Sequence, residues 1–148
     1  MHRSLLLVLM LMTGSLAGCV STEPLVIEVT ASETDVEVVQ SYHDGVLTDS
    51  LAAVVAFDFS GSASAVTYVL ETSDGREPAE GSAEDGGVLN LTFDTHGVYN
   101  ITATAIDAKG REVSQNLVVR VNLIIEWNEE ATQDPASLSF DPLPMHGG

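Results

Sequence analysis

The sequence predicts an all-β fold in which two antiparallel sheets pack face to face. Several segments alternate apolar and polar residues with a period of two, as half-buried strands do, and they are residues 25–29, 51–59, 66–70, 89–93, 99–105 and 117–127. No stretch repeats apolar residues at helical spacing over the length of a helix. The 148 residues suffice for one domain of ordinary size with a leader and a tail.

The first segments differ in how many of their faces are apolar. In residues 25–29, Leu25, Ile27 and Val29 share one face and Glu28 lies opposite, so one side of the strand should meet the core. Residues 51–59 are apolar on both faces, as expected of a central strand. In residues 66–70 the alternation is shorter and is centred on Tyr68.

The later segments alternate more regularly. Residues 89–93 and 99–105 place apolar side chains on one face and Asn or Thr on the other, and the segment 117–127 is the longest and ends at Trp127. Glycine, which readily adopts the positive φ of tight turns, falls between the segments in the pairs Asp44-Gly45, Ser60-Gly61, Asp74-Gly75, Gly86-Gly87 and Lys109-Gly110. Roughly seven strands in this pattern predict an immunoglobulin-like sandwich over residues 25–127.

The start of the chain has the layout of a secretory signal peptide. Arg3 precedes an apolar run over residues 5–12, which is too short to span a bilayer, and small residues follow it. Leu16-Ala17-Gly18-Cys19 resembles the lipobox of prokaryotic lipoproteins, in which the chain is cut before the cysteine and the thiol receives a diacylglyceryl group. The alternative is an ordinary signal peptide that happens to contain a cysteine.

The resemblance implies a signal peptide at residues 1–18, lipid at Cys19, and a tether at residues 19–24. We therefore expect an extracytoplasmic protein that is held on a membrane of the cell envelope by its lipid. Cys19 is the only cysteine, so the mature domain has no internal disulfide and its stability must come from its apolar core.

The charge of the chain is strongly acidic. All 22 acidic residues but only four basic residues follow Cys19, which leaves a formal net charge of −18. Nucleic acid is excluded as an expected partner because phosphate binding needs clustered Lys and Arg. Acidic composition of this kind also keeps a protein soluble in a salty environment.

Two acidic segments lack strand periodicity. Residues 73–87 are expected to form one long loop, either a mobile connection or a ligand-binding loop. Residues 128–148 contain three prolines and are expected to be a disordered tail or the beginning of a linker.

Three blocks of the strand pattern resemble the PKD (polycystic kidney disease) domain family, an Ig-like β-sandwich of cell-surface and secreted proteins. The residues 57–62, "FDFSGS", are similar to the family's D-x-S-G-S element, and the residues 68–75, "YVLETSDG", lie where the family has Y-x-W-D-F-G-D-G. Leu70 stands in place of the family's tryptophan, so other side chains must fill that volume. The third block, residues 93–110, resembles Y-x-x-x-G-x-Y-x-V-x-L-x-V-x-D-x-x-G.

The third block also contains residues that could perform acid–base chemistry. In an enzyme, His96 would act as a base oriented by Asp94 or Asp107. The alternation places Asp107 at the far end of the strand from His96, so these residues should not meet. We instead expect Gly97 to allow a corner, Tyr99 to turn inward and bond to backbone, and Asp107 to cap the next turn. The sequence therefore predicts a protein that is not an enzyme.

Other candidate sites depend on surface residues. Calcium is the one cofactor that the acidic residues could bind, with Asp58, Asp74 and Asp107 as oxygen donors near strand ends, although no D-x-D-x-D-G loop is present. His43 and His146 have no neighbouring His or Cys at zinc-ligand spacing. Asn90 and Asn100 begin N-x-T sequons and should face outward on neighbouring strands, where both could carry glycans.

These features predict a lipid-anchored cell-surface protein whose PKD-like domain mediates protein or glycan binding, adhesion or spacing. The alternative is an accessory subunit that presents or assists a secreted hydrolase or transporter, since PKD modules often accompany such enzymes. The expected partners are the membrane, through the lipid anchor, and a surface protein or glycan.

Overall fold

The computed structural model describes residues 23–130, 133–138 and 145–146. The predicted signal peptide, the lipidation site Cys19 and most of the predicted tether lie outside these residues. Parts of the predicted tail also lie outside them. Within the described residues, no helix is long and apolar enough to cross a membrane.

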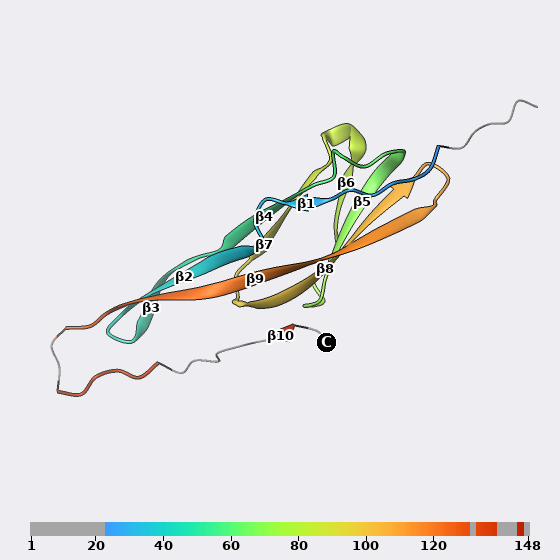
Figure 1. Ribbon diagram of the computed structural model, residues 1–148. Helices are drawn as coiled ribbons and strands as arrows, with labels where there is room; N and C mark the ends of the chain where they lie inside the picture. Colours follow the sequence, from blue (N-terminus) through green and yellow to red (C-terminus); the bar gives the residue numbers. More distant parts are fainter. Residues whose placement is uncertain (1–22, 131–132, 139–144, 147–148) are drawn as a thin grey trace, which may run out of the picture.

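The predicted all-β sandwich is confirmed, because the described chain forms two sheets (Figure 1). The smaller sheet has the order β1-β4-β7 and consists of β1 (Thr30–Ala31), β4 (Ala53–Asp58) and β7 (Val88–Phe93). The larger sheet has the order β3-β2-β9-β8-β5-β6, and its strands are β2 (Asp35–His43), β3 (Val46–Leu51), β5 (Ala65–Thr72), β6 (Ala79–Ser82), β8 (Gly97–Asp107) and β9 (Glu112–Asn128). In addition, β10 (Met145–His146) pairs with β8.

Among the described strands, the pairing is antiparallel with two exceptions. β2 runs parallel to β9 and β10 runs parallel to β8, whereas the sequence pattern predicts antiparallel sheets only. The parallel pairing of β2 arises because the chain passes from β1, in the smaller sheet, directly to the edge of the larger sheet beside β9.

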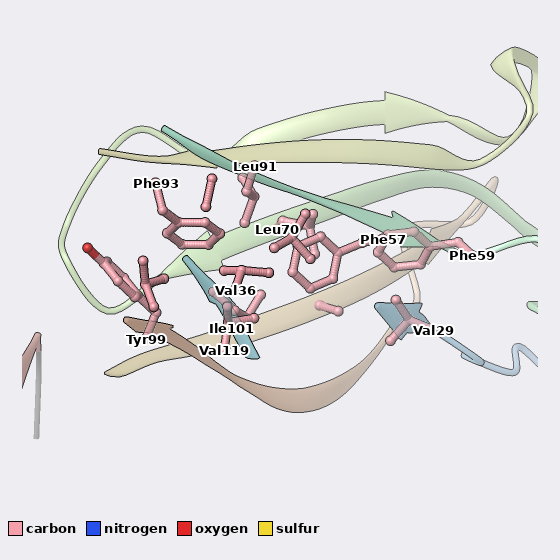
Figure 2. Close-up of a cluster of buried hydrophobic side chains, with 14 of the residues drawn as sticks. Val29, Val36, Phe57, Phe59, Leu70, Leu91, Phe93, Tyr99, Ile101 and Val119 are labelled. Carbon is pink, nitrogen blue, oxygen red and sulfur yellow. The ribbon is translucent and has the colours of Figure 1, made fainter. Parts of the chain in front are cut away.

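The core lies between the two sheets and follows the predicted alternation (Figure 2). Phe57, Phe59 and Phe93 come from the smaller sheet and its connections, and Leu70 and Ile101 face them from the larger one; all five are fully buried. Figure 2 shows Phe93 and Tyr99 at one end of the core and Phe59 and Val29 at the other. Apolar side chains therefore fill the interior without the tryptophan of the PKD pattern.

The structure corrects the expected start of the sandwich. Residues 25–29 form only an isolated bridge, between Val26 and Ala63, and the first strand is the two-residue β1. The expected strand at residues 51–59 is interrupted at Ala52, because the chain crosses there from β3 in the larger sheet to β4 in the smaller sheet.

The structure also contains strands that the alternation did not predict. β2 and β3 form a hairpin around Asp44 and Gly45, whose φ values of 48° and 76° are those of a tight turn with positive φ at both central residues. Residues 73–87, which were expected to be one long loop, contain β6 and the 3₁₀ turn η1 (Ala83–Asp85). This segment is therefore a short edge strand with a capped turn.

Candidate functional site

The predicted tyrosine corner is present at the start of β8. Tyr99 is 1% exposed, and its hydroxyl donates a hydrogen bond to the carbonyl oxygen of Thr95 at 2.6 Å. Gly97 has a φ of 154°, and it is buried at the bend that leads from β7 into β8. Burial raises the pKa of the Tyr99 phenol, which keeps the hydroxyl protonated and able to donate. The corner is thus a structural element.

An ion pair beside the corner joins the two sheets. Asp74 follows β5 and accepts hydrogen bonds from Arg76 Nε at 2.8 Å and Nη2 at 2.5 Å, and Arg76 Nη1 donates to the carbonyl of Thr92 in β7. The guanidinium also lies over the rings of Phe93 and Tyr99, at 5.1 and 5.9 Å from their centroids. Arg76 therefore closes one end of the sandwich.

This arrangement favours the ionised form of the Asp74 carboxyl group. Partial burial opposes its charge, but hydrogen bonds from Arg76 and the Thr72 hydroxyl outweigh the burial and lower its pKa from 3.8 to about 2. The carboxylate therefore serves a structural ion pair.

Asp107 caps the turn between β8 and β9, as the sequence predicts. One carboxylate oxygen accepts from the backbone N–H groups of Lys109 and Arg111 at 2.8 and 2.9 Å, and the other accepts from Arg111 Nε at 2.6 Å. The backbone N–H of Arg111 is the main reason that the pKa of Asp107 is lowered, and its side chain adds to the effect.

The three candidate calcium ligands do not form one site. Asp74 follows the end of β5 that pairs with Ile101, whereas Asp107 pairs with Ala65 at the other end of the same strand. At about 3.3 Å per residue the two carboxylates lie roughly 20 Å apart. Asp58 ends β4 in the other sheet, where the Ser60 backbone N–H bonds to it and lowers its pKa. Among the described residues, no three His, Cys, Asp or Glu side chains are grouped as metal ligands would be.

The two sequon asparagines are exposed, but they lie in different sheets. Asn90 is in β7 of the smaller sheet and Asn100 is in β8 of the larger sheet. The expectation that they lie on neighbouring strands is therefore wrong, because the chain crosses between the sheets at the corner before Gly97. Glycans on these residues would project from opposite faces of the sandwich.

His96 and Asp107 are held apart by β8. His96 precedes Gly97, the first residue of the strand, and Asp107 is its last residue. A strand of this length separates its ends by roughly 30 Å. The pairing required for His96 to act as a base oriented by Asp107 is therefore not formed.

The larger sheet ends in a three-stranded extension, which we call the distal arm. It consists of residues 39–43 of β2, all of β3 and residues 124–128 of β9, and Figure 1 shows it extending beyond β4 and β7. Val36, Val38 and Val121 lie under the smaller sheet and are buried, whereas all six residues of β3 are exposed. Among the described residues, therefore, no second sheet packs over the distal arm.

The distal arm carries the one tryptophan of the chain. The rings of Trp127 and Tyr42 stack with their centroids 5.5 Å apart, and this pair comes from parallel strands in register. Near the tip, a shallow hollow of about 370 Å³ is lined by Ser41, Tyr42, His43, Thr48, Glu126, Trp127 and Asn128. The Ser41 hydroxyl donates to Glu126 at 2.9 Å. The tip therefore combines aromatic, hydroxyl and carboxylate groups on one exposed ribbon.

The sequence pattern places Trp127 only as the end of a strand, and it does not predict β2 and β3. The signal that could have identified them was Asp44-Gly45, a pair typical of two-residue hairpin turns, with Val36 and Val38 alternating upstream. Arg76 was also missed, because its partners Thr92 and Phe93 are distant in sequence.

Comparison with known proteins assigns no family. No family model matches the chain, and no curated protein matches it. Among solved structures, the crystal structure of CopC from Methylosinus trichosporium OB3b aligns with a TM-score of 0.37 and 16% identity, over 68% of this chain and 95% of that chain. A similarity this weak supports no conclusion about function.

Proposed function

We propose that this chain is a non-enzymatic, lipid-anchored protein of the cell surface, whose PKD-like sandwich presents the distal arm to a protein or glycan. The proposal combines the lipobox-like sequence at Cys19 with the position of the distal arm. The tyrosine corner at Tyr99 and the turn capped by Asp107 support the Ig-like, PKD-like assignment, because both occur where the family pattern places them.

The observation that carries the proposal is that β9 begins next to the start of the described chain and ends in the distal arm. The carbonyl of Glu23, shortly after Cys19, accepts a hydrogen bond from Arg111 Nη2 at 3.2 Å, next to the start of β9. Trp127 lies near the other end of this 17-residue strand. At about 3.3 Å per residue, β9 spans roughly 50 Å, and Figure 1 shows the start of the described chain and the distal arm at opposite ends of the molecule.

This geometry suits a tethered binding module. A lipid at Cys19 would hold the Glu23 end at the membrane, because acyl chains contribute about 0.8 kcal/mol per buried methylene. The acidic domain would be repelled by anionic headgroups. The distal arm would then point away from the membrane, toward molecules outside the cell.

The anchor is tested by expressing the full chain in a host that processes lipoproteins. We expect wild type to fractionate with membranes and to have the mass of a chain that begins at Cys19 and carries lipid. Cys19→Ser should release the protein in soluble form. If wild type remains soluble or carries no lipid mass, the anchoring part of the proposal is wrong.

The binding role is tested with isolated polysaccharide and protein fractions of the native envelope. Wild type should bind one of the fractions, and Tyr42→Ala/Trp127→Ala should weaken binding at least about tenfold, a loss of about 1.4 kcal/mol. Val88→Ala, which alters an exposed side chain of β7, is the matched control. Equal binding by all three proteins would remove the distal arm from the proposal. Turnover of a substrate by wild type would contradict the non-enzymatic role.

A further inference from the structure

We propose that the free edge of β3 binds an extended, positively charged segment of another protein as an added β-strand. This inference rests on the proposed function, since it names the class of partner for the distal arm. An edge strand presents a row of backbone N–H and C=O groups, which a second chain can pair with by strand addition.

The position of β3 in the sheet leaves one of its edges open. β3 is the terminal strand of the larger sheet, and within the described residues it pairs only with β2. All six of its residues are exposed, including the apolar Val46, Leu47 and Leu51 at 64%, 47% and 66%. A strand that buried these side chains would gain apolar contacts in addition to backbone hydrogen bonds.

Contacts obstruct the outer edges of β7 and β6, the end strands on the opposite side of the sandwich. The carbonyl of Thr92 in β7 is occupied by Arg76. β6, at the opposite end of the larger sheet, has only four residues. Leu89 of β7 packs against Gly81 in the middle of β6, because a Cβ atom added to Gly81 would lie 2.5 Å from a Leu89 methyl group. β3, in contrast, is exposed along all six residues and pairs on one side only within the described chain.

The negative charge of the distal arm favours a positively charged partner. The distal arm contains no Lys or Arg, whereas it includes Asp49 and Glu126, and Asp44, Glu129 and Glu130 adjoin its strands. Asp49 lies in β3 itself, and opposite charges on adjacent strands stabilise a strand pair whereas like charges destabilise it. A strand in which Lys or Arg alternates with apolar residues would place basic side chains beside Asp49 on one face and apolar side chains beside Leu47 on the other.

A second copy of this chain is a less favourable occupant. Twofold antiparallel pairing of two β3 strands centred on Asp49 would place the two Asp49 carboxylates directly opposite each other, where like charges destabilise a strand pair. The acidic surface of the whole chain adds further repulsion between copies. The charge pattern therefore favours a basic partner over self-pairing.

The proposal is tested by titrating the full chain, solubilised in detergent, with a short synthetic peptide in which lysine alternates with valine. Calorimetry should show saturable binding, and amide hydrogen exchange should slow in β3. A peptide that alternates glutamate with valine should not bind. An otherwise identical lysine peptide, N-methylated along one edge, should bind at least about tenfold more weakly, because it loses several backbone hydrogen bonds to β3.

Matched variants separate the edge from general charge attraction. Asp49→Lys should weaken binding of the lysine peptide at least about tenfold, a loss of about 1.4 kcal/mol. Glu80→Lys makes the same charge change on an exposed residue of β6 and should change binding less than about twofold. Leu51→Glu, at another exposed position of β3, tests the apolar contribution while adding negative charge. Circular dichroism and thermal melts establish that each variant is folded.

Three results would overturn the inference: equal effects of Asp49→Lys and Glu80→Lys, protection outside β3, or a wild-type dimer that Leu51→Glu dissociates. The last result would identify a second copy as the occupant. If wild type binds envelope material through Trp127 but ignores the lysine peptide, the proposed function stands and this inference fails. If the peptide binds at β3 but no envelope fraction does, the edge is real and the proposed function fails.

Discussion

Arg76 lies over the ring of Phe93, with its guanidinium carbon 5.1 Å from the ring centroid. The same guanidinium forms an ion pair with Asp74 after β5 and bonds to the carbonyl of Thr92 in β7. It therefore connects the larger sheet to the smaller one at the end where Tyr99 closes the core.

Arg76→Ala should lower the free energy of unfolding by about 2 to 4 kcal/mol. It removes charge-assisted hydrogen bonds and a cation–π contact, and it leaves the partly buried Asp74 carboxylate without its cation. Urea denaturation measures the loss. Arg120→Ala, at an exposed position of β9, is the control and should cost less than about 0.5 kcal/mol. A loss in Arg76→Ala no larger than that of the control would show that the cluster is not stabilising.

The stability of the domain should fall as the pH drops from about 4 to about 2. The pKa of Asp74 is about 2 in the folded chain and 3.8 without the fold, so its stabilising effect is complete above the unfolded pKa and is lost as the pH falls through the folded pKa. Because the pair reaches solvent, we expect a contribution of order 1 kcal/mol. Thermal melts of wild type and Asp74→Asn across this range provide the measurement. The variant should be less stable above pH 4 and should lose less on acidification; parallel curves would contradict the assignment.

Tyr99→Phe should destabilise the domain by about 1 kcal/mol, because it removes a hydrogen bond and leaves the Thr95 carbonyl without this donor. The ring and its packing against Phe93 are retained. Tyr42→Phe serves as a control, since that hydroxyl donates to the Gln40 side chain on the distal arm at a longer distance of 3.2 Å. Chemical denaturation should show the larger loss for Tyr99→Phe, and the reverse order would contradict a stabilising tyrosine corner.

Millimolar calcium should leave the melting temperature unchanged. Asp74 and Asp107 already accept hydrogen bonds from Arg76 and Arg111, and the two carboxylates are too far apart to share one ion. Differential scanning calorimetry with and without calcium tests this expectation. A rise in melting temperature that Asp58→Asn abolishes would instead reveal a calcium site at the end of β4.

The sequence predicts most of the strands that bury one face in the core between the two sheets. Residues 99–105 alternate in burial along β8 as expected, and Tyr99 and Asp107 make the contacts predicted for them. These features are local: one buried face imposes a period of two on the strand, and a corner or turn is formed by residues within a few positions of one another.

The distal arm could not be predicted in the same way. β3 is exposed along its whole length, so burial imposes no alternation on it and the strand leaves little signal in the sequence. β2 shows alternation only at Val36 and Val38, where the smaller sheet covers it. The rest of β2 becomes a strand because it pairs with β9, which is distant in sequence. In this pairing Tyr42 lies beside Trp127.

The sequence by itself determined the acidic character of the chain, its single cysteine and the positions of the half-buried strands β5, β7 and β8, because composition and period-two patterning are properties of the chain alone. Only the tertiary structure decided which sheet each strand joins. It placed Asn90 and Asn100 on different sheets, brought Arg76 to Thr92 and Phe93, and left one edge of β3 open. These outcomes depend on pairing and packing between residues that are distant in sequence, which local periodicity does not encode.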